Sequence, residues 1–143
     1  MQNNVIKIEE CIRYLDWKIR RKGRGIIRDE EITPLQFYAL QMIKFQEGEA
    51  TPTYLTNLLK LAPSTVSDMI RKMEHGGYIK KTVTEYDKRS FHIDTTEKGD
   101  KLISDVIDER RKYLDSCLSG ENVDEINKIT DALTHLYEIL SKE

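Results

Sequence analysis

The segment from Pro63 to His75 combines an apolar stripe with polar groups that suit contact with nucleic acids. Its apolar residues recur at three- and four-residue steps, which predicts a helix with one buried face. They are Val66, Met69, Ile70 and Met73. A helix can enter the major groove of DNA, where outward hydroxyl, carboxylate and cationic side chains reach phosphates and base edges. The candidate DNA-contacting residues of this helix are Ser64, Thr65, Ser67, Asp68, Arg71 and Lys72. For the two hydroxyls at its start, simple capping of the helix is the alternative.

A second group of candidate residues follows in a segment with a different period. Between Tyr78 and Thr95, apolar residues fall on alternate positions around a charged stretch, which predicts a two-stranded hairpin. Lys88 and Arg89 lie at its tip, and a cation there can enter a narrow minor groove with its strong negative potential. The alternative is that these cations only solvate the hairpin tip.

The segments around these two groups are predicted to be helical. A stripe of apolar residues from Val5 to Ile19 predicts a first helix that ends near Gly23, where Gly-Arg-Gly interrupts the pattern. Thr33, Pro34 and Gln36 form a capping box with proline in the first turn, and the helix they start is apolar on most sides and is expected to be buried.

Further start signals define the remaining elements. Thr51-Pro52 precedes a short helix from Thr53 to Leu61. Thr95 or Thr96 starts a long helix that runs to about Leu118, and Asn122 with Glu125 caps the last helix. The fold is therefore expected to be mainly α with a small β-hairpin wing, that is, a winged helix-turn-helix with additional helices at both ends.

Composition and charge limit the class of protein. The length of 143 residues suits one domain, and the formal net charge of −2 does not by itself favour a nucleic-acid partner. The charge is unevenly distributed, however, because residues 13–28 are strongly basic and residues 96–143 are acidic. No apolar run is long enough for a membrane helix, and residues 1–10 lack the pattern of a signal peptide, so we expect a cytoplasmic protein with no membrane partner.

Enzyme and metal chemistry are not indicated. The sequence has no phosphate-binding loop, nucleophile elbow or His-Glu-x-x-His motif. His75, His92 and His135 are scattered, and neither Cys11 nor Cys117 has a partner at metal-ligand spacing. We therefore expect a protein that is not an enzyme, with no metal site and no cofactor.

Several motifs resemble those of the MarR family of winged helix-turn-helix regulators. The resemblance covers about residues 32–99. It is carried by Asp87-Lys88-Arg89-Ser90 with Ile93 and Thr96-Glu97-Lys98-Gly99, by Pro63-Ser64-Thr65-Val66-Ser67 with Met73-Glu74 and Gly77-Tyr78-Ile79, and by Ile32-Thr33, Gln36 and Leu40. The sequence departs from the family's pattern at Asp68 and Arg71, where members often carry a basic residue first and an acid second.

The resemblance implies a sequence-specific regulator of transcription, most often a repressor, that binds double-stranded DNA as a homodimer on a pseudo-palindromic operator. It implies Arg89 in the minor groove and the helix from Pro63 to His75 in the major groove. It also implies a dimer held by the first helix and the last two. The apolar stripes of these three helices support that expectation, because a two-fold dimer would bury them and set two reading helices about one DNA turn apart, or a multiple of it. Packing of all three helices within one chain is the alternative. We therefore predict a helical dimerisation region at residues 1–30 and 100–143 and a DNA-binding region at residues 31–99.

Regulators of this kind often respond to a small molecule. Tyr14, Trp17, Tyr38 and Met42, together with Phe37, are candidates to line a pocket for a small aromatic or lipophilic effector, although ordinary core packing would also explain them.

Two alternatives stay open. Cys11 lies on the first helix, where the organic-hydroperoxide-sensing branch of the family keeps a reactive cysteine, and Tyr14 is one turn away. The first alternative is therefore a regulator that senses organic peroxides through Cys11. An inert cysteine is the simpler interpretation of this residue. The near-neutral charge also fits a winged-helix module that binds only proteins.

Overall fold

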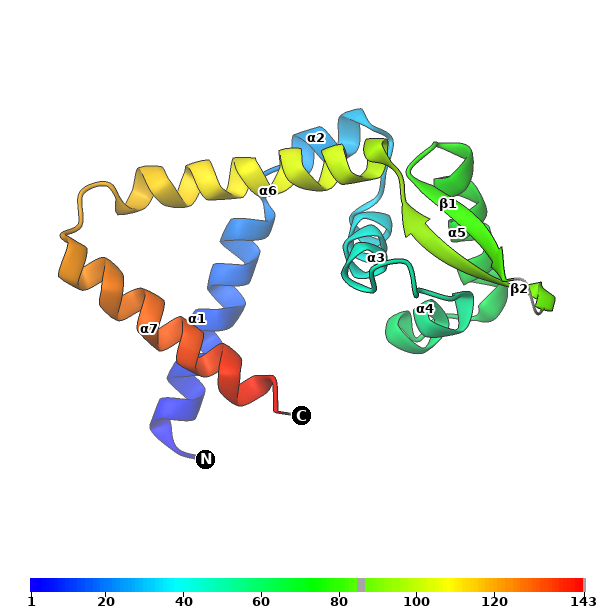
Figure 1. Ribbon diagram of the computed structural model, residues 1–143. Helices are drawn as coiled ribbons and strands as arrows, with labels where there is room; N and C mark the ends of the chain where they lie inside the picture. Colours follow the sequence, from blue (N-terminus) through cyan, green and yellow to red (C-terminus); the bar gives the residue numbers. More distant parts are fainter. Residues whose placement is uncertain (85–86, 143) are drawn as a thin grey trace. The chain divides into compact units, whose positions relative to one another are not determined.

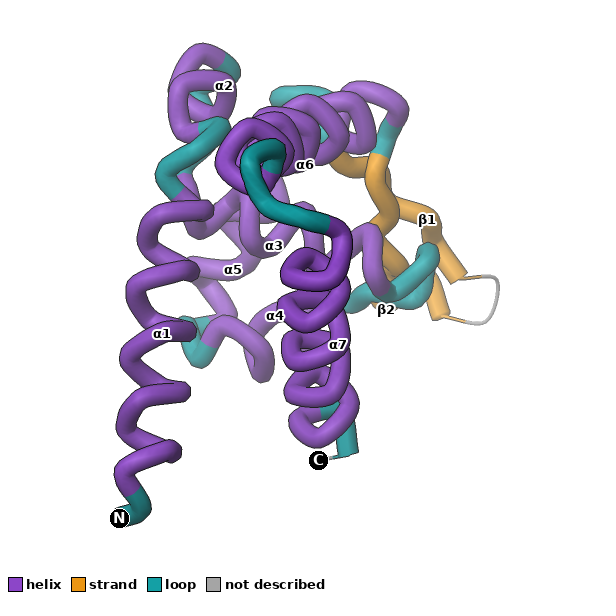
Figure 2. The backbone as a smooth tube through the Cα atoms, turned by 90° about the vertical axis from the view of Figure 1, so that its left-hand side faces the viewer, coloured by secondary structure: helices purple, strands orange, loops and turns teal. Residues whose placement is uncertain are grey.

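The computed structural model of the protein describes residues 1–84 and 87–142, with only the backbone described at residues 84 and 87–90. Figures 1 and 2 show a mainly helical chain with one small pair of strands. The elements in chain order are α1 (Asn3–Arg20), α2 (Arg24–Asp29), α3 (Pro34–Phe45), α4 (Pro52–Leu59), α5 (Pro63–His75), β1 (Ile79–Thr84), β2 (Asp87–Thr95), α6 (Glu97–Leu118) and α7 (Val123–Leu140). The expected winged helix-turn-helix order is confirmed.

Local capping chemistry fixes most helix starts. The Thr33 hydroxyl accepts a hydrogen bond from the Gln36 amide (3.1 Å), and the Gln36 side chain accepts one from the Thr33 amide (3.0 Å). Thr51 accepts from the Tyr54 amide at the start of α4, and Thr96 accepts from the Gly99 amide at the start of α6. Each of these bonds satisfies an amide that has no partner within its helix, so the sequence signals named above act as predicted.

The hydrophobic core lies between α3, α4, α5, the hairpin and the first half of α6. Its largest fully buried side chains are Leu40, Ile43, Leu55, Ile70, Ile93, Val66 and Val106. The strands pair antiparallel from Ile79–Thr95 to Thr84–Asp87, with an irregularity after Val83. The Ile93 amide also donates to the Ala50 carbonyl (2.8 Å), which attaches the hairpin to the chain between α3 and α4.

The first helix ends before Gly23, close to where the sequence predicts, and residues 24–29, for which no element was predicted, form the short helix α2. The Gly-Arg-Gly run interrupts the helical pattern for only a few residues, because Gly23 adopts a left-handed conformation (φ 87°) and a new helix begins at once. Gly23 also packs closely on α6, since a Cβ there would lie 2.7 Å from Cγ1 of Val106. Ile27 of α2 then joins the core.

The burial of α3 was overestimated. Phe37, Leu40 and Ile43 are buried, whereas Leu35 and Tyr38 remain 44% and 41% exposed. The helix therefore has one core face and one apolar face that is open in the single chain. Tyr38 on that open face lines a cavity.

The chain forms two compact units, Met1–Arg110 and Arg111–Glu143, with the boundary inside α6. In the first unit, α6 buries Leu102, Ile103 and Val106. Neither α1 nor α7 has a buried residue. Among the described residues, no helix has the length and apolar character needed to span a membrane.

Candidate DNA-binding surface and ligand cavity

The helix α5 separates its two kinds of side chain cleanly. Its inner face is buried through the four apolar residues named above, and α4 and β1 pack against it. The six candidate residues lie away from this core: Ser64, Thr65, Ser67, Arg71 and Lys72 are exposed and Asp68 is half-buried. The helix therefore presents a continuous polar face, as the sequence predicted.

The first turn of α5 has no side-chain cap. The N-cap residue is Ala62, whose carbonyl accepts from the amides of Thr65 and Val66. Ser64 and Thr65 lie inside the helix, so the simpler interpretation that they cap it is wrong. Their hydroxyls remain beside a helix N-terminus, where the partial positive charge favours an anion such as a phosphate.

Asp68 forms ion pairs with both cations of α5. Its carboxylate lies 3.1 Å from Nζ of Lys72 and also accepts from the guanidinium of Arg71. The hydrogen bond from Lys72 contributes most to lowering the pKa of Asp68, and the hydrogen bond from Arg71 contributes next. The carboxylate is therefore charged at neutral pH. The cations themselves stay open to solvent, with side chains 75% exposed at Arg71 and 66% at Lys72.

The hairpin is fixed to α5 at its base. Nζ of Lys81 on β1 lies 3.5 Å from the Glu74 carboxylate and 4.8 Å from the centre of the Phe91 ring on β2. The predicted wing residues Lys88 and Arg89 follow in β2, and their side chains lie outside the described residues.

Tyr78 joins the end of α5 to two other elements. Its hydroxyl donates to the Glu30 carboxylate (2.7 Å), and its carbonyl accepts from the Thr96 amide (3.1 Å). Burial, followed by the hydrogen bond to Glu30, raises the pKa of Tyr78 to about 12. Lys98 lies over the ring at 4.5 Å and donates to the Gly76 carbonyl (2.8 Å). These contacts fix α5 and the wing base to the start of α6.

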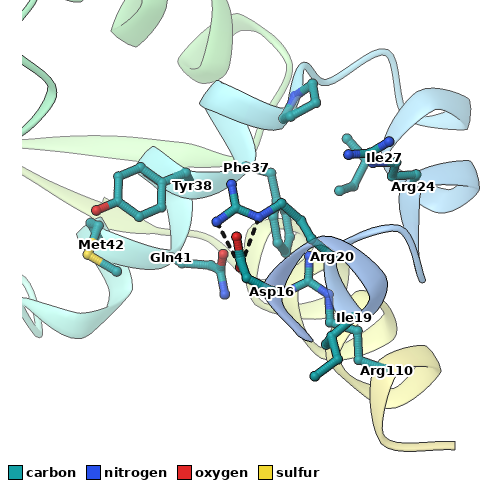
Figure 3. Close-up of a pocket in the computed structure, with 11 residues that line it drawn as sticks. Asp16, Ile19, Arg20, Arg24, Ile27, Phe37, Tyr38, Gln41, Met42 and Arg110 are labelled. Carbon is teal, nitrogen blue, oxygen red and sulfur yellow. Dashed lines mark hydrogen bonds and ion pairs between the residues drawn. The ribbon is translucent and has the colours of Figure 1, made fainter. Parts of the chain in front are cut away.

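A cavity of about 290 Å³ lies among α1, α2, α3 and α6 within the first unit (Figure 3). Tyr38 and Met42, two of the predicted effector residues, line it, and so does Phe37. The cavity also has charged lining residues that were not predicted from the sequence, namely Asp16, Arg20, Arg24 and Arg110. Their positions depend on helices far apart in the chain, and the basic composition of residues 13–28 was the only sequence signal for them.

The electrostatics of this cavity are dominated by cations. Asp16 pairs with Arg20 at 3.0 Å, as the dashed lines in Figure 3 show. The guanidinium of Arg110 lies 5.6 Å from the centre of the Phe37 ring, and its Nε donates to the Lys22 carbonyl (3.3 Å). Burial and the nearby charge of Arg20 lower the pKa of Arg110. The cavity thus offers aromatic and aliphatic walls beside a partly desolvated cation.

The other two predicted effector residues lie elsewhere. Trp17 packs its ring under the guanidinium of Arg21 at 4.8 Å, outside the cavity. Tyr14 lines a separate, open hollow on α1 together with Cys11, which is exposed. Cys117 on α6 is exposed as well. The described residues contain no cluster of three His, Cys, Asp or Glu side chains that could hold a metal ion.

Comparison with known proteins places this arrangement in a family. The model of the MarR family matches residues 31–90, which span α3 to the wing. A MarR family protein of known structure from Bacillus stearothermophilus is 31% identical, with 99% of each chain covered and a TM-score of 0.81. The chain belongs to the MarR family. Membership confirms the family and the fold class expected from the sequence.

Two further relatives are named as transcriptional regulators. The transcriptional regulator Tm0710 from Thermotoga maritima is 32% identical over 95% of each chain, with a TM-score of 0.82. The HTH-type transcriptional regulator YsmB of Bacillus subtilis is 29% identical over 98% of this chain and 95% of its own. These relatives are transcriptional regulators and not enzymes, in agreement with the expectation from the sequence.

A structure solved with DNA adds a further comparison of the fold alone. The MepR–DNA complex of S. aureus is 21% identical, covers 92% of this chain and 98% of its own, and has a TM-score of 0.69.

Proposed function

We propose that this MarR-family regulator is a homodimeric repressor that binds a pseudo-palindromic operator in double-stranded DNA and responds to a small effector. The observation that carries the DNA-binding part is the face of α5, which exposes hydroxyls and cations directly opposite its buried stripe. Such a face suits the major groove, where cations and hydroxyls contact phosphates and base edges. The MepR–DNA complex supports this assignment by its fold.

The proposal of a dimer rests on apolar side chains that the single chain leaves open. On α1, Val5, Ile8, Ile12 and Leu15 are 43–47% exposed. On α7, Ile129, Leu133, Tyr137 and Leu140 are 44–69% exposed. Each set repeats at helical spacing, and stripes of this kind on both ends of one chain are typical of helices that pack on a second copy.

The proposed effector site is the cavity among α1, α2, α3 and α6. Phe37, Tyr38 and Met42 supply apolar contacts, so a small aromatic or lipophilic molecule fits the lining. Arg110, held over the Phe37 ring, favours a carboxylate on that molecule. An effector bound here would contact α1, α3 and α6 at once and could change how the DNA-binding surface is held.

The DNA-binding proposal can be tested without knowing the operator. The purified protein is used to select duplexes from a random-sequence library, and fluorescence anisotropy then measures affinity for a selected and a scrambled duplex at several salt concentrations. We expect a selected sequence with two-fold symmetry. Lys88→Ala at the predicted wing tip should reduce the salt slope by about one unit. Lys128→Ala removes the same charge from an exposed position on α7 and should leave the slope unchanged. A protein that enriches no duplex contradicts the proposal and favours a protein-interaction module.

The effector site is tested with benzoate as a minimal aromatic anion and benzyl alcohol as its neutral counterpart. Benzoate should raise the melting temperature of the wild-type protein and weaken its affinity for the selected duplex. Arg110→Gln should abolish the preference for benzoate over benzyl alcohol. Equal responses of wild type and variant would contradict the assignment of Arg110.

A further inference from the structure

The DNA-binding surface of α5 contains a negative charge between its two cations. Asp68 lies one turn before Arg71 and Lys72, at the i,i+3 and i,i+4 spacings that bring side chains together on a helix. One carboxylate oxygen contacts Arg71 and the other lies 3.1 Å from Lys72. The three side chains therefore form one network on the face that we assign to DNA.

This network opposes the usual basis of non-specific DNA binding. Affinity for DNA of any sequence comes from cations that neutralise phosphates and release counterions. A carboxylate in contact with both cations competes with phosphates for them and repels phosphates itself. The outward face of α5 thus carries less effective positive charge than its Arg and Lys would otherwise give it.

The same network leaves hydrogen-bonding capacity for base edges. A guanidinium has five N–H donors, and the contact with Asp68 leaves several of them available on a side chain that is 75% exposed. Arg bonds guanine at O6 and N7, and a carboxylate accepts from N4 of cytosine, so Arg71 and Asp68 together match the two edges of a C·G pair. Phosphates offer no such donor to a carboxylate.

We propose that Asp68 is a specificity-determining residue, which holds Arg71 and Lys72 away from phosphates and, with Arg71, selects a C·G pair in each half of the operator. This inference rests on the proposed DNA-binding function. On non-cognate DNA the two cations stay paired with Asp68. On the cognate pair, Arg71 bonds guanine while Asp68 orients it and accepts from cytosine.

The test compares Asp68→Asn with Glu74→Gln. Both changes remove one negative charge from α5, but Glu74 pairs with Lys81 of the wing base and not with Arg71 or Lys72. Each variant is taken through the library selection and then measured by anisotropy on the wild-type selected duplex and on a scrambled duplex of equal composition. Circular dichroism is used to check that each variant keeps the helix content of the wild type.

We expect Asp68→Asn to bind the scrambled duplex about 3- to 10-fold more tightly, with a salt slope about one to two units steeper, because two cations become available to phosphates. Its ratio of selected to scrambled affinity should fall about 5- to 150-fold, the discrimination of one good base contact. One C·G position in each half-site should also lose its preference in the reselected sequences. Glu74→Gln should keep the wild-type ratio and sequence preference.

Two other results are informative. If Asp68→Asn keeps the wild-type ratio, slope and selected sequence, or changes only as Glu74→Gln does, the role of Asp68 is refuted while the DNA-binding function stands. If the wild-type protein itself selects no duplex, the proposed function fails and the role of Asp68 fails with it.

Discussion

Gly99→Ala is predicted to destabilise the protein strongly, although it adds a single methyl group. Gly99 lies in the first turn of α6, directly against the backbone of Tyr78. A Cβ at this position would overlap the Tyr78 carbonyl oxygen and lie 3.3 Å from its carbonyl carbon and 3.4 Å from Cδ1 of Leu40. The backbone of Tyr78 cannot move away easily, because its carbonyl accepts the Thr96 amide and its hydroxyl bonds to Glu30.

The size of this effect follows from two opposing contributions. Overpacking a tight contact costs about 1–3 kcal/mol, and more where backbone atoms must separate. The better helix propensity of alanine returns up to about 1 kcal/mol in a helix. Because the contact of Gly99 is with backbone atoms, the overpacking cost is taken at its upper end of about 3 kcal/mol. We therefore expect Gly99→Ala to lower the free energy of unfolding by about 2–3 kcal/mol, measured by urea denaturation with circular dichroism.

Gly120→Ala is the matched control. It makes the same substitution after the end of α6, where an added Cβ meets nothing within 4 Å. This variant should be neutral or slightly more stable, because alanine restricts the unfolded chain. Equal stability of the two variants would refute the claim that the close contact with Tyr78 requires glycine at position 99. Since Tyr78 lies in the short connection between α5 and β1, Gly99→Ala should also weaken DNA binding at temperatures where the protein is folded.

Three further predictions concern the wing, the proposed dimer and an ion pair of α6. Arg89→Ala should weaken DNA binding strongly and reduce the salt slope by about one unit; an unchanged affinity across salt would contradict the wing assignment. Leu133→Glu places a charge in the exposed apolar stripe of α7 and should weaken dimerisation about a hundredfold or more in sedimentation equilibrium, whereas His135→Glu on the opposite face should not. Asp100→Asn should cost about 0.5–1 kcal/mol at pH 7 in urea denaturation, because it removes the negative charge that pairs with Lys44 while leaving an oxygen to accept from Thr95. These contacts lower the pKa of Asp100, Lys44 contributing most, so the stabilisation is present above the ordinary pKa near 3.9 and is lost as the pH falls from there through the lowered pKa of the folded protein. The difference between Asp100→Asn and wild type should therefore shrink as the pH falls below about 3.9; a difference that stays constant as the pH falls would contradict the ionic origin.

The helix starts could be predicted because their determinants are local. Thr33 and Thr51 each precede a proline and cap the following helix with a hydroxyl, and these interactions span only three residues. The buried stripe of α5 was equally clear, since its period of three to four residues continues through four apolar positions. Fold class and the polar face of α5 follow from such short-range patterns.

Features that depend on distant parts of the chain could not be predicted. The glycines on either side of Arg24 indicate the end of the first helix, but they do not indicate that a second helix follows at once. That helix, α2, begins after Gly23, which has a left-handed conformation and packs closely on Val106 of α6. The charged lining of the cavity brings Arg110 of α6 beside Lys22 and Phe37, a contact that no local pattern specifies. The ion pairs of Asp68 could have been predicted from spacing, but their effect on two candidate DNA-contacting cations is clear only with all three side chains on one face.

The stoichiometry of the complex with DNA tests the central proposal most directly. The wild-type protein is mixed with its selected duplex, and the mass of the complex is measured by sedimentation equilibrium at near-physiological salt. A homodimer that reads a pseudo-palindrome through two copies of α5 predicts two chains on one duplex, with little complex on a scrambled duplex. A single chain bound per duplex, or equal binding to both duplexes, would contradict it.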